Sequence, residues 1–151
     1  GVSASYKGYD FSVFMQGVAR TSFFINPNDI SPFVNERNAL DVIANNHWSI
    51  NNPDPNAFWP RLSTYSISNN EQQSTWWQRD GDFLRLKNIE IGYTFPEIES
   101  GLLSTLNTRL YFSGLNLLTF SKFDLWDTEM GGNGLGYPPQ KVYNIGLQVN
   151  F

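Results

Sequence analysis

Alternation of apolar and polar residues is the dominant pattern along the chain and predicts β-strands. The clearest case is the C-terminal segment, where every second residue is apolar: Tyr143, Ile145, Leu147, Val149 and Phe151. Alternation over this length is typical of a strand with one apolar and one polar face. The same pattern predicts four further strands, at about 2–6, 9–19, 83–95 and 107–120.

The third predicted strand changes its phase halfway along. Ile91 and Tyr93 share one phase, whereas Leu84 and Leu86 occupy the other. One inserted residue turns the side chains that follow it to the opposite face of the strand. The change of phase therefore predicts either a β-bulge or a membrane boundary near Lys87.

The predicted connections alternate between short and long. They are a tight turn at 7–8, a loop over about 21–82, a modest connector at 97–106 and a loop over 121–140. Eleven asparagines between Asn26 and Asn70 favour turns over strand pairing. We expect one short helix within the long loop, from Glu36 to Ala44, and a helical turn in the connector from Gly101 to Leu106.

Two fold classes fit this pattern. Short turns alternating with long loops are typical of a bacterial outer-membrane β-barrel, and strands of this length suffice for a tilted membrane crossing. The alternative is a soluble β-sandwich, in which the apolar faces meet in a core. Five strands cannot close a barrel without open edges in lipid, so the barrel interpretation requires a larger wall.

Composition narrows the range of functions. The 151 residues include 16% charged and 16% aromatic residues, and the formal net charge is −4. This charge argues against nucleic acid as a partner. The absence of cysteine excludes disulfides and thiolate metal sites. No run of 18 apolar residues is present that would predict a transmembrane helix.

Several motifs resemble one family in detail. They are the segments RDGDFLRLKNIEIGYTFP at 79–96, LYFSGLNLLTFSKF at 110–123, WDTE at 126–129 and the terminal strand through Phe151. These segments resemble corresponding stretches of the SusC/RagA family of TonB-dependent outer-membrane transporters. The openings SYKGYD at 5–10 and FMQG at 14–17 also fit this family, whereas 26–70 is not diagnostic.

The resemblance implies an all-β fold, the last five or so strands of a plugged antiparallel barrel of about 22 strands. Residues 1–151 are then the C-terminal part of the barrel domain, and the signal peptide, TonB-contacting segment and plug lie outside this chain. The implied function is TonB-dependent import of a glycan or peptide oligomer across the bacterial outer membrane. The implied partners are a SusD-like lipoprotein, the TonB complex, the outer-membrane assembly machinery and outer-membrane lipid.

Candidate ligand contacts are the five tryptophans of the predicted long loops, because aromatic faces stack on sugars and on peptide side chains. They are Trp48, Trp59, Trp76, Trp77 and Trp126. Packing within the loop, or contact with the lipoprotein, is the simpler interpretation of these residues. A soluble carbohydrate-binding β-sandwich would use the same tryptophans and stands as the alternative function.

No catalytic or metal-binding constellation is apparent. Asp124, Asp127 and Glu129 could suggest a cation site, but a solvated acidic loop explains them better. His47 is the single histidine and is interpreted as a loop residue. We therefore expect neither an enzyme, nor a metal, nor another cofactor.

The C-terminal residue gives the first testable prediction. Phe151, with the apolar residues at alternate positions before it, resembles the signal read by the outer-membrane assembly machinery. Deletion of Phe151 from the full-length protein should lower its folded level in the outer membrane. Heat-modifiability on gels measures this level, and an unchanged level would contradict the assignment.

Overall fold

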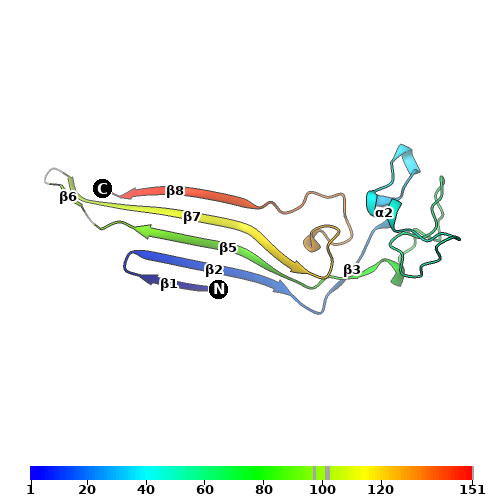
Figure 1. Cartoon of the computed structure of the whole chain (residues 1–151), viewed down its shortest axis with the longest axis horizontal. Helices are drawn as coiled ribbons and strands as arrows, with labels where there is room; N and C mark the ends of the chain where they lie inside the picture. Colours follow the sequence, from blue (N-terminus) through cyan, green and yellow to red (C-terminus); the bar gives the residue numbers. More distant parts are fainter. Residues whose placement is uncertain (97, 101–102, 151) are drawn as a thin grey trace. The chain divides into compact units, whose positions relative to one another are not determined.

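The chain divides into two compact units in the computed structural model, which describes residues 1–96, 98–100 and 103–150 (Figure 1). We call the first the sheet unit; it comprises Gly1–Thr21, Asp82–Lys122 and Pro138–Phe151. We call the second the loop unit; it comprises Ser22–Gly81 and Phe123–Tyr137.

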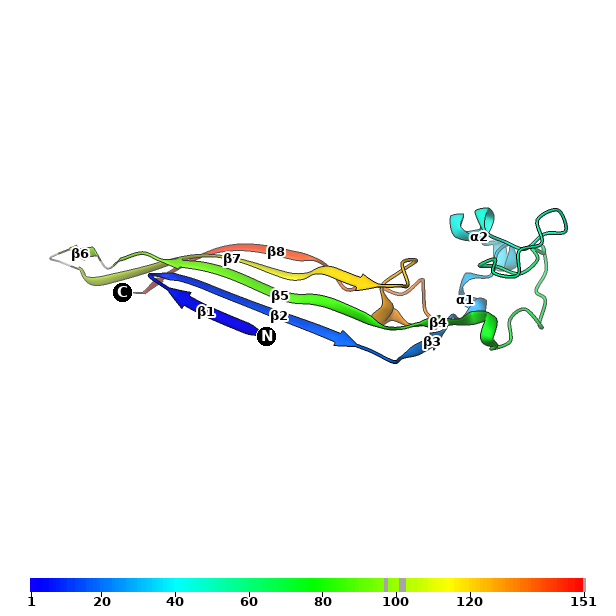
Figure 2. The same ribbon diagram turned by 60° about the horizontal axis from the view of Figure 1, so that its bottom comes forward.

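The sheet unit is an antiparallel sheet whose long strands match the five predicted ones (Figure 2). Its strands are β1 Val2–Tyr6, β2 Tyr9–Val18, β5 Phe83–Thr94, β6 Ile98–Ser100, β7 Leu103–Ser121 and β8 Val142–Asn150. Strand β2 pairs with β1 and β5, and β7 pairs with β5, β6 and β8. The 64 residues between β2 and β5 therefore connect two neighbouring strands of the same sheet.

The strand register places apolar residues together on one face. Two adjacent rows across β2, β5, β7 and β8 are Tyr9–Tyr93–Leu110–Leu147 and Phe11–Ile91–Phe112–Ile145. We call the surface that carries these rows the apolar face. Much of it is exposed; Ile145, for example, retains 79% of its accessible surface. A large exposed apolar surface of this kind is what contact with lipid requires.

The opposite surface, which we call the polar face, carries rows such as Ser12–Glu90–Ser113–Asn144. Four of the five residues of the predicted assembly signal, Tyr143, Ile145, Leu147 and Val149, are exposed on the apolar face. The fifth, Phe151, lies outside the described residues.

The predicted irregularity at Lys87 is confirmed as a bulge. Phe14 lies opposite Asn88 but Met15 lies opposite Leu86, so Lys87 is an extra residue in β5. The insertion brings the side chain of Leu86 to the apolar face even though its sequence phase is reversed.

The turn between β1 and β2 is also as predicted. Tyr6 pairs with Tyr9, which leaves Lys7 and Gly8 as the two turn residues. Their φ values are 48° and 86°. Two positive φ angles are typical of a type I′ turn, whose twist matches that of the strands.

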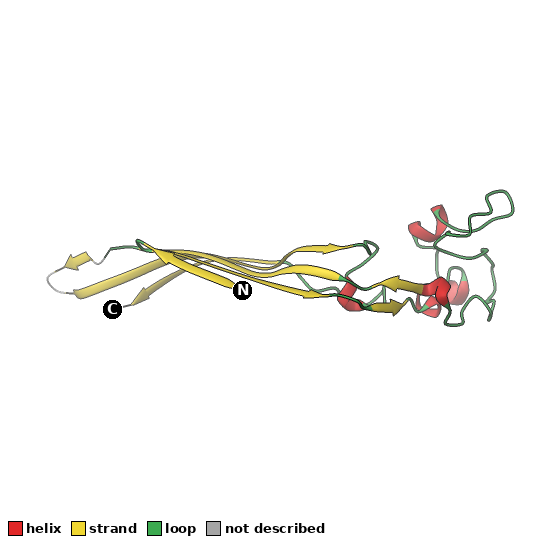
Figure 3. Ribbon diagram, turned by 90° about the horizontal axis from the view of Figure 1, so that it is seen from below, coloured by secondary structure: helices red, strands yellow, loops and turns green. Residues whose placement is uncertain are grey.

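The loop unit contains short elements, which include all the described helices (Figure 3). They are β3 Ser22–Phe24, α1 Pro27–Ile30, η1 Val34–Glu36, α2 Asp41–Asn45, η2 Thr75–Trp77, β4 Gln78–Asp80 and η3 Thr128–Met130. Strands β3 and β4 pair antiparallel. Within the described residues, no helix has the length and apolar character needed to cross a membrane.

Two local predictions are wrong. The helix expected from Glu36 to Ala44 is confined to α2, because Glu36 has a positive φ of 62° and Arg37 and Leu40 have extended backbone, with ψ values of 146° and 149°. The helical turn expected in the connector is replaced by pairing of β6 with the start of β7, where Ile98 lies opposite Leu106. Residues 101 and 102 of that turn lie outside the described residues.

The two faces of β8 offer a matched pair of substitutions. Ile145→Lys places a charge on the apolar face, which costs about 2–4 kcal/mol near the middle of a bilayer. Asn144→Lys places the same charge on the polar face and should be tolerated. We expect the folded outer-membrane level of the full-length protein to fall for Ile145→Lys alone. Equal levels for the two variants would show that the apolar face does not contact lipid.

Candidate functional site

The polar face carries a compact charged cluster. Arg109 of β7 donates from Nε to Asp10 Oδ1 of β2 at 3.0 Å, and its Nη2 donates to Asp10 Oδ2. The same Nη2 donates to Glu90 Oε1 of β5 at 2.7 Å. One guanidinium thus joins three neighbouring strands through charge-assisted hydrogen bonds.

Glycines make room for this cluster. A Cβ atom on Gly92 would lie 2.5 Å from Arg109 Nη2, so only glycine lets the arginine cross β5 to reach β2. In the same row, a Cβ on Gly146 would lie 2.3 Å from the ring of Tyr111. The Arg109 guanidinium lies 5.1 Å from the centre of that ring. The cluster is therefore a tightly packed joint between strands, in which the charged groups are paired with one another.

The loop unit has its own hydrophobic core. The buried members are Ile25, Ile30, Ile43, Phe58, Trp59, Trp77 and Phe123. The rings of Trp59 and Trp77 lie 5.1 Å apart, and Phe123 contacts Trp126 edge-on at 4.9 Å. The residues come from both segments of the unit, so the loop between Phe123 and Tyr137 is part of the same core.

Packing accounts for four of the five candidate tryptophans. Trp59 and Trp77 are 4% and 1% exposed, and Trp76 and Trp126 are partly buried against the core. The indole N–H groups of Trp76, Trp77 and Trp126 donate to backbone carbonyls at 3.4, 3.0 and 2.8 Å. These contacts support the packing interpretation, and Trp48 is the candidate that lines an open surface.

Two open hollows lie side by side on the loop unit and share Arg61 and Leu62. The first hollow encloses about 380 Å³ and is lined by Phe33, Arg61, Leu62, Ser63, Thr64, Tyr65 and Ile67. The second hollow encloses about 340 Å³ and is lined by His47, Trp48, Ser49, Ile50, Arg61 and Leu62. Both volumes fall in the range of ligand pockets, about 300–1,000 Å³.

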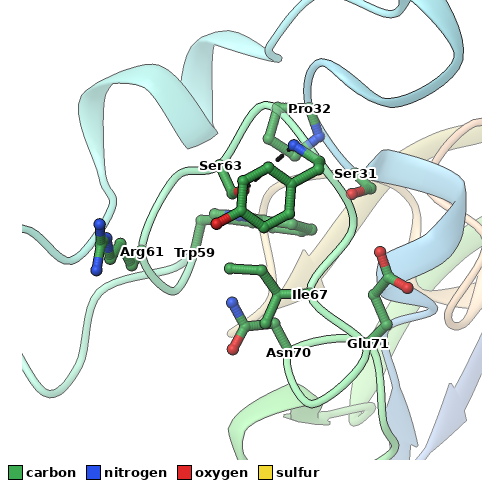
Figure 4. Close-up of a pocket in the computed structure, with 9 residues that line it drawn as sticks. Ser31, Pro32, Trp59, Arg61, Ser63, Ile67, Asn70 and Glu71 are labelled. Atoms are coloured by element: carbon green, nitrogen blue, oxygen red, sulfur yellow. Dashed lines mark hydrogen bonds between the residues drawn. The ribbon is translucent and has the colours of Figure 1, made fainter.

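A third depression, beside Trp59, is too small for a ligand (Figure 4). It encloses about 10 Å³, the room needed by one water molecule. Glu71 lies at its rim and accepts hydrogen bonds from Ser66 Oγ at 2.8 and 2.7 Å. The candidate binding surface is therefore the pair of larger hollows.

Two of the three arginines of the loop unit stabilise its fold. Arg37 donates from Nη1 to two carbonyl oxygens of α1 at 2.8 and 3.0 Å. Arg79 donates from Nη1 to the carbonyl oxygens of Trp76 and Gln78 at 2.7 and 2.8 Å, and its guanidinium lies 5.7 Å from the ring centre of Phe58. Burial lowers the pKa of the Arg79 guanidinium below its usual value.

Arg61 is different from these two arginines. Its side chain is exposed, and across the described residues its guanidinium makes no hydrogen bond or ion pair. Figure 4 shows the guanidinium directed away from Trp59 and lying on the opposite side of it from Glu71. The site thus presents one unused positive charge between two hollows.

The remaining sequence candidates have structural roles or no ligand geometry. Asp127 accepts from the backbone N–H of Glu129 at 3.0 Å at the start of η3. His47 Nδ1 lies 3.1 and 3.0 Å from the carbonyl oxygens of Ile43 and Ala44. Among the residues that the structure describes, no group of three metal-ligating side chains is present.

Sequence reasoning missed Arg61 and its neighbours Phe33 and Tyr65. They lie in a Pro- and Asn-rich stretch without periodicity, so no pattern indicated which side chains are exposed. The only signal is that Arg61 is one of few basic residues in an acidic segment.

The curated relatives that match this chain are TonB-dependent receptors of Formosa agariphila (strain DSM 15362 / KCTC 12365 / LMG 23005 / KMM 3901 / M-2Alg 35-1). TonB-dependent receptor P26 is 27% identical over 97% of this chain and 16% of the relative. TonB-dependent receptor P3 is 34% identical over 48% of this chain and 9% of the relative. The chain therefore spans about a sixth of the first relative's length. No protein-family profile matches the chain.

Similar solved structures come from the RagAB peptide importer. Its closed-closed state matches 99% of this chain and 16% of the solved chain, with a TM-score of 0.71 and 25% identity. Its open-open state matches the same shares with a TM-score of 0.69 and 24% identity. These matches confirm the resemblance to SusC/RagA-family transporters and the fold class, a segment of an antiparallel β-barrel, over the β-sandwich.

Packing and ligand contact can be separated by two tryptophan substitutions. Trp77→Ala leaves a cavity in the loop core and should destabilise the loop unit by about 3–5 kcal/mol. Trp48→Ala removes a half-buried ring at the second hollow and should change stability little. Limited proteolysis of the folded full-length protein measures both effects, with faster cleavage within 22–81 expected for Trp77→Ala. Equal protease resistance of the two variants would contradict the assigned core.

Proposed function

We propose that this chain is a C-terminal wall segment of a TonB-dependent outer-membrane transporter that imports an oligomeric nutrient. The observation that carries the proposal is the match to such proteins along nearly the whole chain, 97% in sequence and 99% in structure. The relatives and solved chains are about six times longer, so the activity belongs to a larger protein. In this proposal the protein is not an enzyme.

The proposed location is the bacterial outer membrane, with the apolar face against lipid and the polar face toward the lumen. The exposed apolar rows across four strands support this orientation. On the polar face, the Arg109 cluster joins β2, β5 and β7 and would keep this part of the wall rigid during transport. The plug and the residues that contact TonB are assigned to parts of the protein outside this chain.

The proposed partners are a SusD-like surface lipoprotein, which acts as a lid, and the TonB complex. The proposed cargo is a peptide, since the solved structures with this fold are of a peptide importer. A glycan oligomer is the alternative cargo of the same transport mechanism.

The loop unit is assigned to capture of the cargo. Its core of buried aromatic residues holds a long loop in one fold, and the two hollows provide concave surfaces of ligand-pocket size. A binding surface on a folded support loses little conformational entropy when a ligand binds.

Removal of the loop unit tests this function. Thr21 N–H donates to Asp82 Oδ1 at 2.9 Å, so the two strand ends that flank the first segment lie close together. Replacing 22–81 by Asn-Gly and 123–137 by a short glycine-rich turn in the full-length protein should keep the barrel folded. We expect unchanged heat-modifiability but loss of energy-dependent peptide uptake.

Two controls complete this experiment. A protonophore applied to cells with the unaltered protein should abolish uptake, as expected for transport driven through TonB. Uptake that continues at the original rate after loop replacement would contradict the capture role. Uptake that is insensitive to the protonophore would contradict TonB-dependent import itself.

A further inference from the structure

We propose that Arg61 is a carboxylate-binding residue for an acidic peptide, whose flanking apolar side chains occupy the two hollows. This proposal rests on the proposed import function and specifies its ligand. It predicts a preference for peptides with an aspartate or glutamate between apolar residues.

Arg61 carries a charge that the fold of the loop unit does not use. The other two arginines of the loop unit donate to backbone carbonyls and hold the fold, whereas Arg61 is exposed and makes no such bond with the described residues. A guanidinium presents a planar fork of donors that matches the two oxygens of a carboxylate. An acidic group on the ligand is therefore the natural counterpart.

The two hollows that flank Arg61 have the size and shape to hold side chains of a ligand. Arg61 and Leu62 form the ridge between hollows of about 380 and 340 Å³. Phe33 and Tyr65 line the first hollow, and Trp48 lines the second. Hollows with apolar side chains in their lining on both sides of a cation fit a short chain with apolar, acidic and apolar groups in succession.

The backbone around Arg61 is held in place by hydrogen bonds. Trp59, two residues before it, is buried and its carbonyl accepts from the backbone N–H of Trp48 at 2.9 Å. The N–H of Trp59 in turn donates to the Asn46 carbonyl at 3.1 Å. The ridge and the second hollow are therefore built on the same hydrogen-bonded support, which favours binding without prior reorganisation.

The acidic character of the loop unit makes Arg61 decisive. Its only basic residues, with histidine counted as neutral, are Arg37, Arg61 and Arg79, among a majority of acidic side chains. Of these three arginines, Arg61 alone lines the two hollows, so its loss would remove the arginine charge that they present to a carboxylate. The affinity for an acidic ligand should depend on this one side chain.

The test uses the full-length transporter purified with its lipoprotein in detergent. The probes are an end-blocked heptapeptide with a central Leu-Asp-Leu and the same peptide with Leu-Asn-Leu, and titration calorimetry measures their affinities. We expect the aspartate peptide to bind at least ~10-fold more tightly than the asparagine peptide. Arg61→Ala should abolish this difference by weakening the aspartate peptide alone, and Arg61→Lys should retain part of it.

Lys141→Ala is the matched control, because it removes an exposed positive charge from the sheet unit. It should leave both affinities unchanged. Equal affinities of the two peptides for the unaltered protein would overturn the proposal, as would equal weakening of both by Arg61→Ala. Arg61-dependent binding of an oligogalacturonate in place of the peptides would overturn the peptide assignment.

Two further outcomes separate this proposal from others. Loss of the co-purified lipoprotein in Arg61→Ala would identify Arg61 as a partner contact and overturn the ligand role. Energy-dependent uptake by cells with the unaltered protein tests the import function independently. If uptake is intact and the peptide preference is absent, the Arg61 proposal fails and the import function stands.

Discussion

The sheet depends on one constraint, that each face must match its surroundings along the whole length of every strand. Side chains alternate between faces, so a shift of one residue would exchange the apolar and polar faces from that point on. The sequence of β5 contains such a shift, and the bulge at Lys87 compensates for it. The pairing of β7 with β5 is also irregular between Leu86 and Asn88, so the bulge affects the register of β7 as well. The apolar rows therefore remain aligned on both sides of the bulge.

The same sheet is held together differently on its two faces. The apolar face uses only side-chain size and hydrophobicity, and much of it is exposed. The polar face uses specific joints, in which Gly92 lets Arg109 reach Asp10 and Gly146 accommodates the ring of Tyr111. These joints fix the register through geometry. In these joints the charged groups are paired with one another, which is typical of a structural role in a barrel wall and not of catalysis.

Periodicity explains which parts of the structure could be predicted. Alternation predicts the five long strands, the turn at Lys7–Gly8 and the bulge, because a sheet with one apolar and one polar face requires apolar and polar residues to alternate in the sequence. The loop unit has no such alternation. Its helix is shorter than predicted because Glu36 adopts a positive φ and Arg37 and Leu40 adopt extended backbone. Arg61 was missed because exposure within a loop depends on long-range packing.

The high aromatic content of the chain thus serves two different physical needs. In the sheet unit, rings such as Tyr9 and Tyr93 lie on the surface assigned to lipid. In the loop unit, ordering some 75 residues without long strands opposes a conformational entropy of roughly 1–2 kcal/mol per residue, so buried area must come from large side chains. Trp59 and Trp77 supply that area. Aromatic abundance in a long loop is therefore weak grounds for ligand binding. The stronger indication is a charged side chain that the fold itself does not use.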